Sequence, residues 1–118
     1  MKFLREFLQA IACLLPICVL SATPCHAGQD DANAYALAKQ NACLGCHAAN
    51  KKIVGPSYQD VAKKYQGNTN ALVYLKNKIR HGGAGAWGVV PMPANTKLSD
   101  AELSVLSVWI LQGAPTPR

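Results

Sequence analysis

Apolar side chains recur at intervals of three and four residues in the C-terminal part of this chain, which is the spacing of one face of an α-helix. The clearest stripe consists of Leu103, Val105, Leu106, Val108, Trp109 and Ile110. The segment Ser99 to Glu102 reads as a capping box before it, and Gly113 ends it. We expect a core helix here, packed across an earlier helix near Tyr35 and Leu37, with no chemical role for Trp109.

Three further helices are expected upstream. The first runs from about Asp31 to Cys46, through strong helix formers without a β-branched run. The second covers Tyr58 to Tyr65, with Ser57 as its cap and Gly67 as its stop. The third covers about Asn70 to Arg80. Its apolar face consists of Leu72, Leu75 and Ile79. No strand pattern of useful length is present, so the sequence predicts an all-α fold.

The N-terminus has the pattern of a secretory signal peptide, with a basic start, an apolar stretch from Phe7 to Ala22 and a small residue, Ala27, at the expected cut. Cleavage there, or alternatively after Ala22, leaves one domain, residues 28–118. The apolar stretch is shorter than the ~20 residues that a spanning helix needs and contains Pro16, so no stable membrane anchor is expected.

Cysteines and charge agree with export. Cleavage removes three of the five cysteines and leaves Cys43 and Cys46, without a stray thiol for an oxidising compartment. It also removes Lys2, Arg5 and Glu6, which lowers the net charge from +6 to +5. An exported chain meets no nucleic acid, so the positive charge is expected to steer it towards acidic partners or anionic surfaces.

Residues Cys43 to His47 read C-x-x-C-H, the attachment signature of c-type haem. On a helix, positions i, i+3 and i+4 share a face, so Cys43 and Cys46 can form thioethers while His47 binds the iron. The alternatives are a disulfide or half of a zinc site. No strand precedes the motif, and no second Cys/His pair follows it apart from a lone His81. One covalent haem, with its iron, is therefore the predicted cofactor.

An iron that carries electrons rather than binding gases needs a sixth ligand. Residues 82–97 are rich in Gly and Pro, have no helical period and hold Met92 between two prolines, which keep it out of any helix. His81 ends the third helix, where it suits the dipole. We predict ligation by Met92 and capping by His81. A thioether raises the reduction potential, and filled axial sites indicate an electron carrier rather than an enzyme.

Several motifs occur together, in order, within residues 31–112. They are Cys43-x-x-Cys46-His47, Val54 to Tyr58, Asp60 to Ala62, Trp87-Gly88, Pro91 to Pro93, Asn95 and the helix of Trp109. In these motifs the chain resembles class I c-type cytochromes, specifically the small bacterial cytochrome c-551 (c8) type. The resemblance implies a small class I cytochrome c fold, with about four helices wrapped around one covalently bound haem.

Further roles come from the resemblance alone. It implies that the Pro56 carbonyl accepts the second N–H of His47 and that Trp87 donates to a haem propionate, with Lys78 nearby. Lys78 stands where an arginine is common, which weakens a planar contact.

The resemblance also implies a hydrogen bond from Asn95 near the Met92 sulfur. One extra residue within Thr96 to Leu98 leaves the local path of the loop open, and His81 occupies a place that is not usually histidine.

The sequence thus predicts a monomeric, periplasmic electron carrier that works through an exposed haem edge, with Lys51 and Lys52 steering its docking. A nitrite reductase, a terminal oxidase or a dehydrogenase could be its partner. Two alternatives stay open: a ligand-binding or peroxidatic haem protein with an open sixth site, and a thiol–disulfide oxidoreductase using Cys43 and Cys46.

Overall fold

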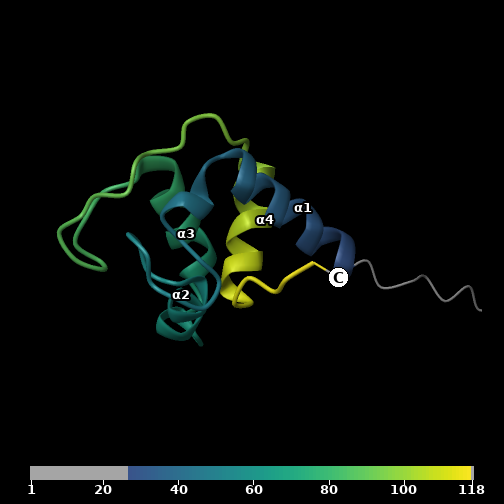
Figure 1. Cartoon of the computed structure of the whole chain (residues 1–118), viewed down its shortest axis with the longest axis horizontal. Helices are drawn as coiled ribbons and strands as arrows, with labels where there is room; N and C mark the ends of the chain where they lie inside the picture. Colours follow the sequence, from purple (N-terminus) through teal and green to yellow (C-terminus); the bar gives the residue numbers. More distant parts are fainter. Residues whose placement is uncertain (1–26, 118) are drawn as a thin grey trace, which may run out of the picture.

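The computed structural model describes residues 27–117 and contains four α-helices and one short 3₁₀ turn (Figure 1). The elements are α1 (Ala27–Gln40), η1 (Cys43–Gly45), α2 (Tyr58–Tyr65), α3 (Ala71–His81) and α4 (Asp100–Leu111). This part of the chain has no strand, only two isolated bridges, so the predicted all-α fold is confirmed. None of its helices is long and apolar enough to cross a membrane. The expected signal peptide lies outside the described residues, apart from Ala27.

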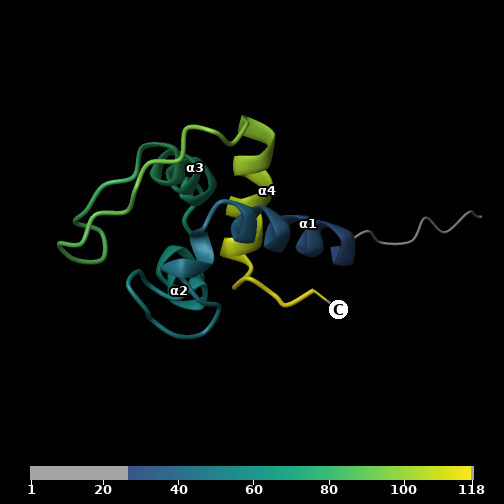
Figure 2. The ribbon, with the colours of Figure 1, turned by 45° about the horizontal axis from the view of Figure 1, so that its top comes forward.

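Helix α4 is the centre of the fold, and α1, α2 and α3 each pack against it (Figures 1 and 2). Trp109 of α4 is buried and meets the ring of Tyr35 of α1 edge-on, with 6.4 Å between ring centroids. Its indole Nε1 donates a hydrogen bond of 3.0 Å to the Pro115 carbonyl. Leu37 packs against the same core, which confirms the predicted crossing of the first and last helices.

The local signals at α2, α3 and α4 were sufficient to predict their bounds to within one residue. The Ser57 hydroxyl accepts from the amide of Asp60 at 3.0 Å and caps α2. Ser99 and Glu102 form the expected capping box of α4. Gly82 follows α3 at φ 65°, a left-handed conformation that glycine adopts without strain.

The first helix lies earlier in the chain than predicted, because α1 spans Ala27–Gln40 and the prediction was Asp31 to Cys46. Ala42 takes a left-handed conformation with φ 59°, which turns the chain out of the helix. The C-x-x-C-H residues then form a separate turn, in which the amide of His47 donates to the Cys43 carbonyl at 3.0 Å. The i, i+4 relation between these two residues is kept, but on this turn and not on a continued α-helix.

The buried apolar faces of α3 and α4 are narrower than predicted. Leu75 and Ile79 of α3 are buried, whereas Leu72 is 37% exposed. Val105 and Val108 of α4 are 37% and 42% exposed, so they lie beside the buried stripe rather than widening it. Only one face of each helix meets the rest of the molecule, and these three side chains lie outside it.

Residues 82–99, called the arm below, connect α3 to α4 without helix, as expected. The arm runs out from the helices and returns (Figures 1 and 2). Gly83 and Met92 pair through both backbone hydrogen bonds, 2.9 and 3.0 Å long, and the amide of Gly85 donates to the Gly88 carbonyl at 2.8 Å. Through this pairing Met92 lies close to the C-terminal end of α3.

One packing defect in α4 gives a test of this core. The Ser107 hydroxyl is buried and has no hydrogen-bond partner among the described residues. Ser107→Ala removes this unsatisfied group and improves helix propensity, so the free energy of unfolding of the holoprotein should rise by about 1 kcal/mol. Ser99→Ala, the same change at the cap of the same helix, should lower it by about 1 kcal/mol. Denaturant unfolding measures both changes. If the two variants lost equal free energy of unfolding, the Ser107 hydroxyl would not be an unsatisfied buried group.

Candidate haem site

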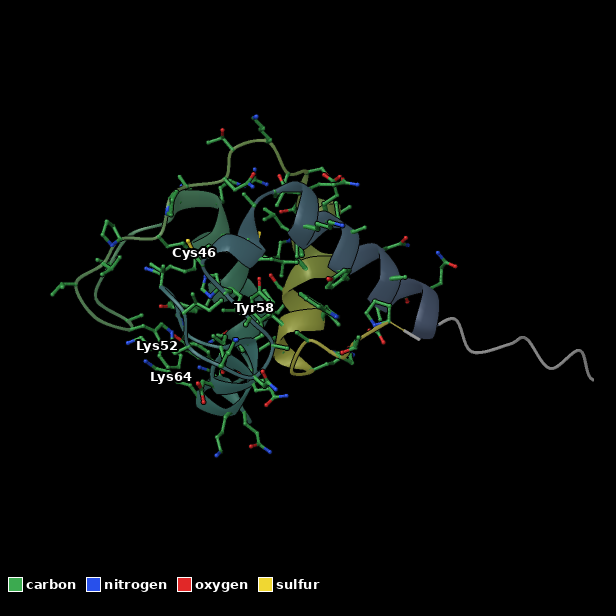
Figure 3. All side chains as sticks on the ribbon, viewed as in Figure 1. Cys46, Lys52, Tyr58 and Lys64 are labelled. Carbon is green, nitrogen blue, oxygen red and sulfur yellow. The ribbon has the colours of Figure 1, made fainter. Side chains whose placement is uncertain are left out.

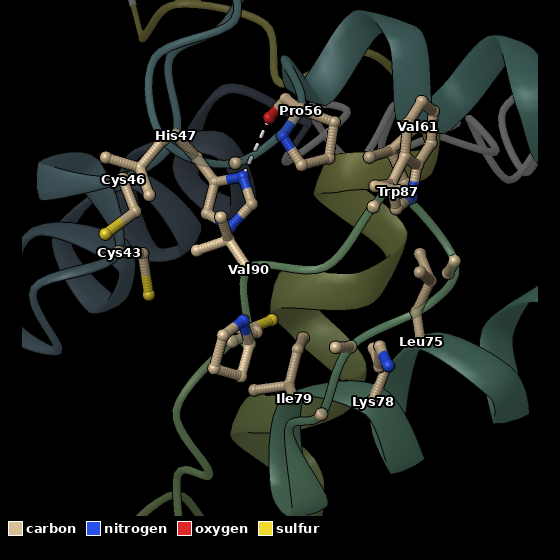
Figure 4. Close-up of a pocket in the computed structure, with 18 of the residues that line it drawn as sticks. Cys43, Cys46, His47, Pro56, Val61, Leu75, Lys78, Ile79, Trp87 and Val90 are labelled. Atoms are coloured by element: carbon tan, nitrogen blue, oxygen red, sulfur yellow. Dashed lines mark hydrogen bonds between the residues drawn. The ribbon is translucent and has the colours of Figure 1, made fainter.

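A mostly apolar cavity of about 380 Å³ lies between η1, α2, α3, α4 and the arm (Figure 4). This volume is within the range of roughly 300–1,000 Å³ that is typical of small-molecule and cofactor sites. The predicted site residues that line it are Cys43, Cys46, His47, Pro56, Lys78, Trp87 and Met92. Figure 4 shows His47 and the two cysteines on one side, with Leu75, Lys78 and Ile79 of α3 on another. Asn95 and His81 are not among the lining residues.

The two cysteines are free, half-buried thiols on the wall of this cavity. Burial raises the pKa of the Cys43 thiol, and its Sγ lies 3.7 Å from the Asn41 carbonyl oxygen. Because the thiol is neutral, this wall of the cavity carries no charge at Cys43. An apolar, planar group can therefore lie against the wall and be bonded to both sulfurs.

The imidazole of His47 is fixed by its neighbours. Its Nδ1 lies 2.7 Å from the Pro56 carbonyl oxygen (dashed line in Figure 4). Because a carbonyl oxygen only accepts, Nδ1 carries the hydrogen in the neutral ring and Nε2 keeps its lone pair for a metal. The geometry therefore contains the hydrogen bond that the family resemblance implies.

Tyr58 ends the motif Val54 to Tyr58, but its role in this site was not predicted from the sequence. Its ring stacks on that of His47, with 5.3 Å between centroids and 18° between planes. Burial raises the pKa of the Tyr58 phenol, so the ring stays neutral beside the imidazole. Its place two residues after Pro56, in the first turn of α2, is the signal that could have indicated this contact.

Gly55 lies directly against the same imidazole. A Cβ at this position would lie 2.8 Å from Nδ1 and 2.9 Å from Nε2 of His47, closer than side chains approach. The Gly55 amide donates to the Cys46 carbonyl at 2.7 Å, so its backbone cannot easily move away. A side chain here would displace the ring.

Met92 reaches the cavity from the arm. It is half-buried, packs against the core and is paired with Gly83 through the backbone. A Cβ at Gly82 would collide with the Met92 carbonyl oxygen, and the positive φ of Gly82 also favours glycine. The arm therefore approaches the end of α3 closely at this point.

Lys64 is the second contributor that sequence reasoning missed. Its Nζ donates to the Ala86 carbonyl at 2.7 Å and lies 4.4 Å from the centroid of the Trp87 ring. It therefore attaches the tip of the arm to α2, on the side of the molecule away from α1 (Figure 3). The contact joins residues 22 apart, and no local pattern indicates it.

The remaining predicted residues lie as follows. Lys78 and Trp87 line the cavity, and Trp87 is 38% exposed at its edge. The Nδ2 of Asn95 donates to the Oδ1 of Asn41 at 3.1 Å, and the hydrogen bond near the Met92 sulfur that the resemblance implies stays a prediction. His81 is exposed at the end of α3.

These residues fit a covalently attached iron porphyrin. Two thiols can bond it, an imidazole with a free Nε2 can bind the iron, and Met92 supplies a thioether on the same cavity. Apolar walls and a few polar groups at the edge match a flat apolar ring with charged substituents.

Comparison with known proteins agrees with this chemistry. The family model described as Cytochrome c matches residues 32–114. Cytochrome c-552 of Hydrogenobacter thermophilus is 53% identical over 75 residues, which span 64% of this chain and 76% of the relative. Cytochrome c-551 of Pseudomonas aeruginosa is 44% identical over 75 residues, which span 64% and 71%. The crystal structure of Nitrosomonas europaea cytochrome c552 has a TM-score of 0.64 at 44% identity, over 67% of this chain and 98% of that one.

The close contact at Gly55 provides a test of the site. Gly55→Ala should push the His47 ring from its place and lower the free energy of unfolding by about 1–3 kcal/mol, as overpacking does. Gly45→Ala is the control, because a Cβ there meets nothing within 4 Å. The optical spectrum and denaturant unfolding of the two exported holoproteins measure the difference. An unchanged Gly55→Ala protein would show that the ring does not lie against this glycine.

Proposed function

The chain belongs to the cytochrome c family, whose cofactor is covalently attached haem c with iron, and we propose that it carries single electrons on a haem ligated by His47 and Met92. The observation that supports this most directly is the shared cavity: an imidazole with a free Nε2 and a methionine line the same apolar space. With both residues bound to the iron, no position would stay open for a small substrate. An electron carrier works without a free position on its iron, whereas a haem enzyme needs one for its substrate.

The haem, when bound, supplies an iron that alternates between Fe(III) and Fe(II). Cys43 and Cys46 hold the ring by thioether bonds. The Pro56 carbonyl orients His47 and makes its Nε2 more basic. The thioether of Met92 is a soft ligand that favours Fe(II) and raises the reduction potential relative to a second histidine. Its backbone pairing with Gly83 fixes the Met92 segment relative to the end of α3.

The edge of the cavity has groups suited to the propionates. We place one propionate near the indole N–H of Trp87 and the ammonium of Lys78, both of which line the cavity. Lys78 acts there as a point charge, without the paired donors of an arginine.

The docking surface is proposed at the rim of the same cavity. Lys51 and Lys52 are exposed, and Lys52 lines the cavity and forms a backbone bridge with His47. Val54, Val89 and Val90 are exposed apolar residues of the rim. Apolar contact surrounded by lysines suits an acidic redox protein. A nitrite reductase, a terminal oxidase or a dehydrogenase is the proposed partner.

We further propose that the protein works in the periplasm as a monomer, after residues 1–27 have been removed as a signal peptide. Its C-x-x-C-H thiols would then be bonded to haem in an oxidising compartment, where two free thiols would otherwise pair.

The decisive experiment replaces the proposed sixth ligand. Met92→Ala should abolish the sulfur-to-iron absorption band of the oxidised protein and lower the reduction potential, within the roughly 0.8 V range that axial ligands span. Optical spectroscopy and redox titration of the holoprotein measure both. A spectrum and potential equal to those of the unsubstituted protein would show that Met92 is not a ligand. It would favour the alternative, a ligand-binding or peroxidatic haem protein with an open sixth site.

The docking proposal predicts a salt-dependent rate. Lys52→Glu should slow reduction by ferrocyanide severalfold at low ionic strength, because it reverses a positive charge at the rim of the cavity. The effect should fade towards 1 M salt, where the Debye length is about 3 Å. Lys39→Glu on α1, exposed and away from the cavity lining, is the control. Stopped-flow kinetics that slow equally in both proteins would indicate a general charge effect and no docking site.

A further inference from the structure

The two proposed iron ligands are carried by different parts of the chain. The turn with His47 follows α1, and the arm with Met92 follows α3. Near Met92, the backbone bonds of the arm lead back to α3: Met92 pairs with Gly83, and the amide of Asn95 donates to the Ile79 carbonyl at 2.9 Å. These bonds fix Met92 relative to α3, but they do not set its position relative to the His47 side.

A side-chain hydrogen bond makes that connection. The Nδ2 of Asn95 donates to the Oδ1 of Asn41 at 3.1 Å, across 54 residues of sequence. Asn41 lies two residues before Cys43, whose Sγ is 3.7 Å from the Asn41 carbonyl oxygen. We call this contact the Asn41–Asn95 bridge. It joins the haem-attachment segment directly to the base of the arm.

Both amides of the bridge are held in one orientation. The Oδ1 of Asn95 accepts from the amides of Lys97 and Leu98, at 3.1 and 3.2 Å, so its Nδ2 must face Asn41. The Nδ2 of Asn41 donates to the Leu37 carbonyl at 2.9 Å, which turns its Oδ1 towards Asn95. If either side-chain amide were flipped, two NH2 groups or two amide oxygens would face each other. The bridge therefore has one defined direction, from Asn95 to Asn41.

We propose that Asn41 is a positioning residue for the sixth ligand: through the Asn41–Asn95 bridge it holds the Met92 segment against the haem-attachment turn. The inference rests on the proposed ligation of iron by Met92. Without the bridge, the described residues have no hydrogen bond between the base of the arm and the haem-attachment segment, and the Met92 sulfur leaves the iron more often. An added ligand that competes for this position then binds more tightly.

The test measures binding of imidazole, a neutral ligand, to the ferric holoprotein. Asn41→Ala should raise its apparent affinity about fivefold to tenfold, which corresponds to one lost hydrogen bond. The absorption change on imidazole titration is the readout. It reports loss of the sixth ligand, whereas a residue that only supports the helix would change the unfolding midpoint and leave this affinity constant.

Two further variants separate the bridge from capping of α1. Asn41→Asp keeps an acceptor for Asn95 but loses the donor to Leu37. Asn41→Ser keeps a hydroxyl that can reach the carbonyl four residues back but is too short to reach Asn95. We expect imidazole affinity near that of the unsubstituted protein for Asn41→Asp and raised affinity for Asn41→Ser. The reverse order would show that capping is what matters and would overturn the proposal. These milder variants also decide the question if Asn41→Ala does not fold.

Met92→Ala keeps this proposal distinct from the ligation on which it rests. In the Met92→Ala background, imidazole should bind tightly whether or not Asn41 is replaced, because no sulfur remains to compete. If Met92→Ala binds imidazole no more tightly than the unsubstituted protein, the ligation itself is wrong and the bridge role falls with it. If Met92→Ala binds more tightly but Asn41→Ala and Asn41→Ser do not, ligation stands and only the bridge role is wrong.

Discussion

A continuous row of aromatic rings connects the His47 side of the site to the centre of the fold. His47 stacks on Tyr58 at 5.3 Å, Tyr58 contacts Trp109 at 5.2 Å, and Trp109 meets Tyr35 of α1 at 6.4 Å. Each such pair contributes roughly 0.5–1.5 kcal/mol beyond the area it buries. Because Trp109 lies where α1 and α4 cross, the imidazole is oriented by the same contacts that hold the helices together. The Pro56 carbonyl then sets the rotation of the ring.

The walls of the cavity and the hydrophobic core are largely the same residues. Side chains that are buried in the core and also line the cavity are Tyr58, Val61, Leu75, Ile79, Leu106 and Ile110. A domain of this size has little apolar surface to bury by itself, and its cofactor completes the core. The haem is therefore structural as well as redox-active, and the positions of the helices and of the ring depend on each other.

The sequence was informative wherever the determinant is local. The caps at Ser57 and Ser99 and the stop at Gly82 fixed three helices, because each depends on residues only a few positions apart. The end of α1 was predicted wrongly, since an alanine in a left-handed conformation has no signature in residue type. Contacts such as Lys64 with Ala86 or Asn41 with Asn95 depend on the path of the arm, which neither periodicity nor turn chemistry determines. The hydrogen bond between His47 and Pro56 came from the family resemblance and not from the local pattern.

The two sides of the site differ in how firmly they are held, and this difference bears on function. On the histidine side, two thioether bonds within the five residues Cys43 to His47 would fix the ligand, and Gly55 packs closely against its ring. On the methionine side, an arm without helix is held by separate contacts at its tip, at Gly83 and at its base. Each contributes on the order of 1 kcal/mol. Under the proposed ligation, these few hydrogen bonds help to decide whether the Met92 sulfur stays at the iron or leaves the sixth position open.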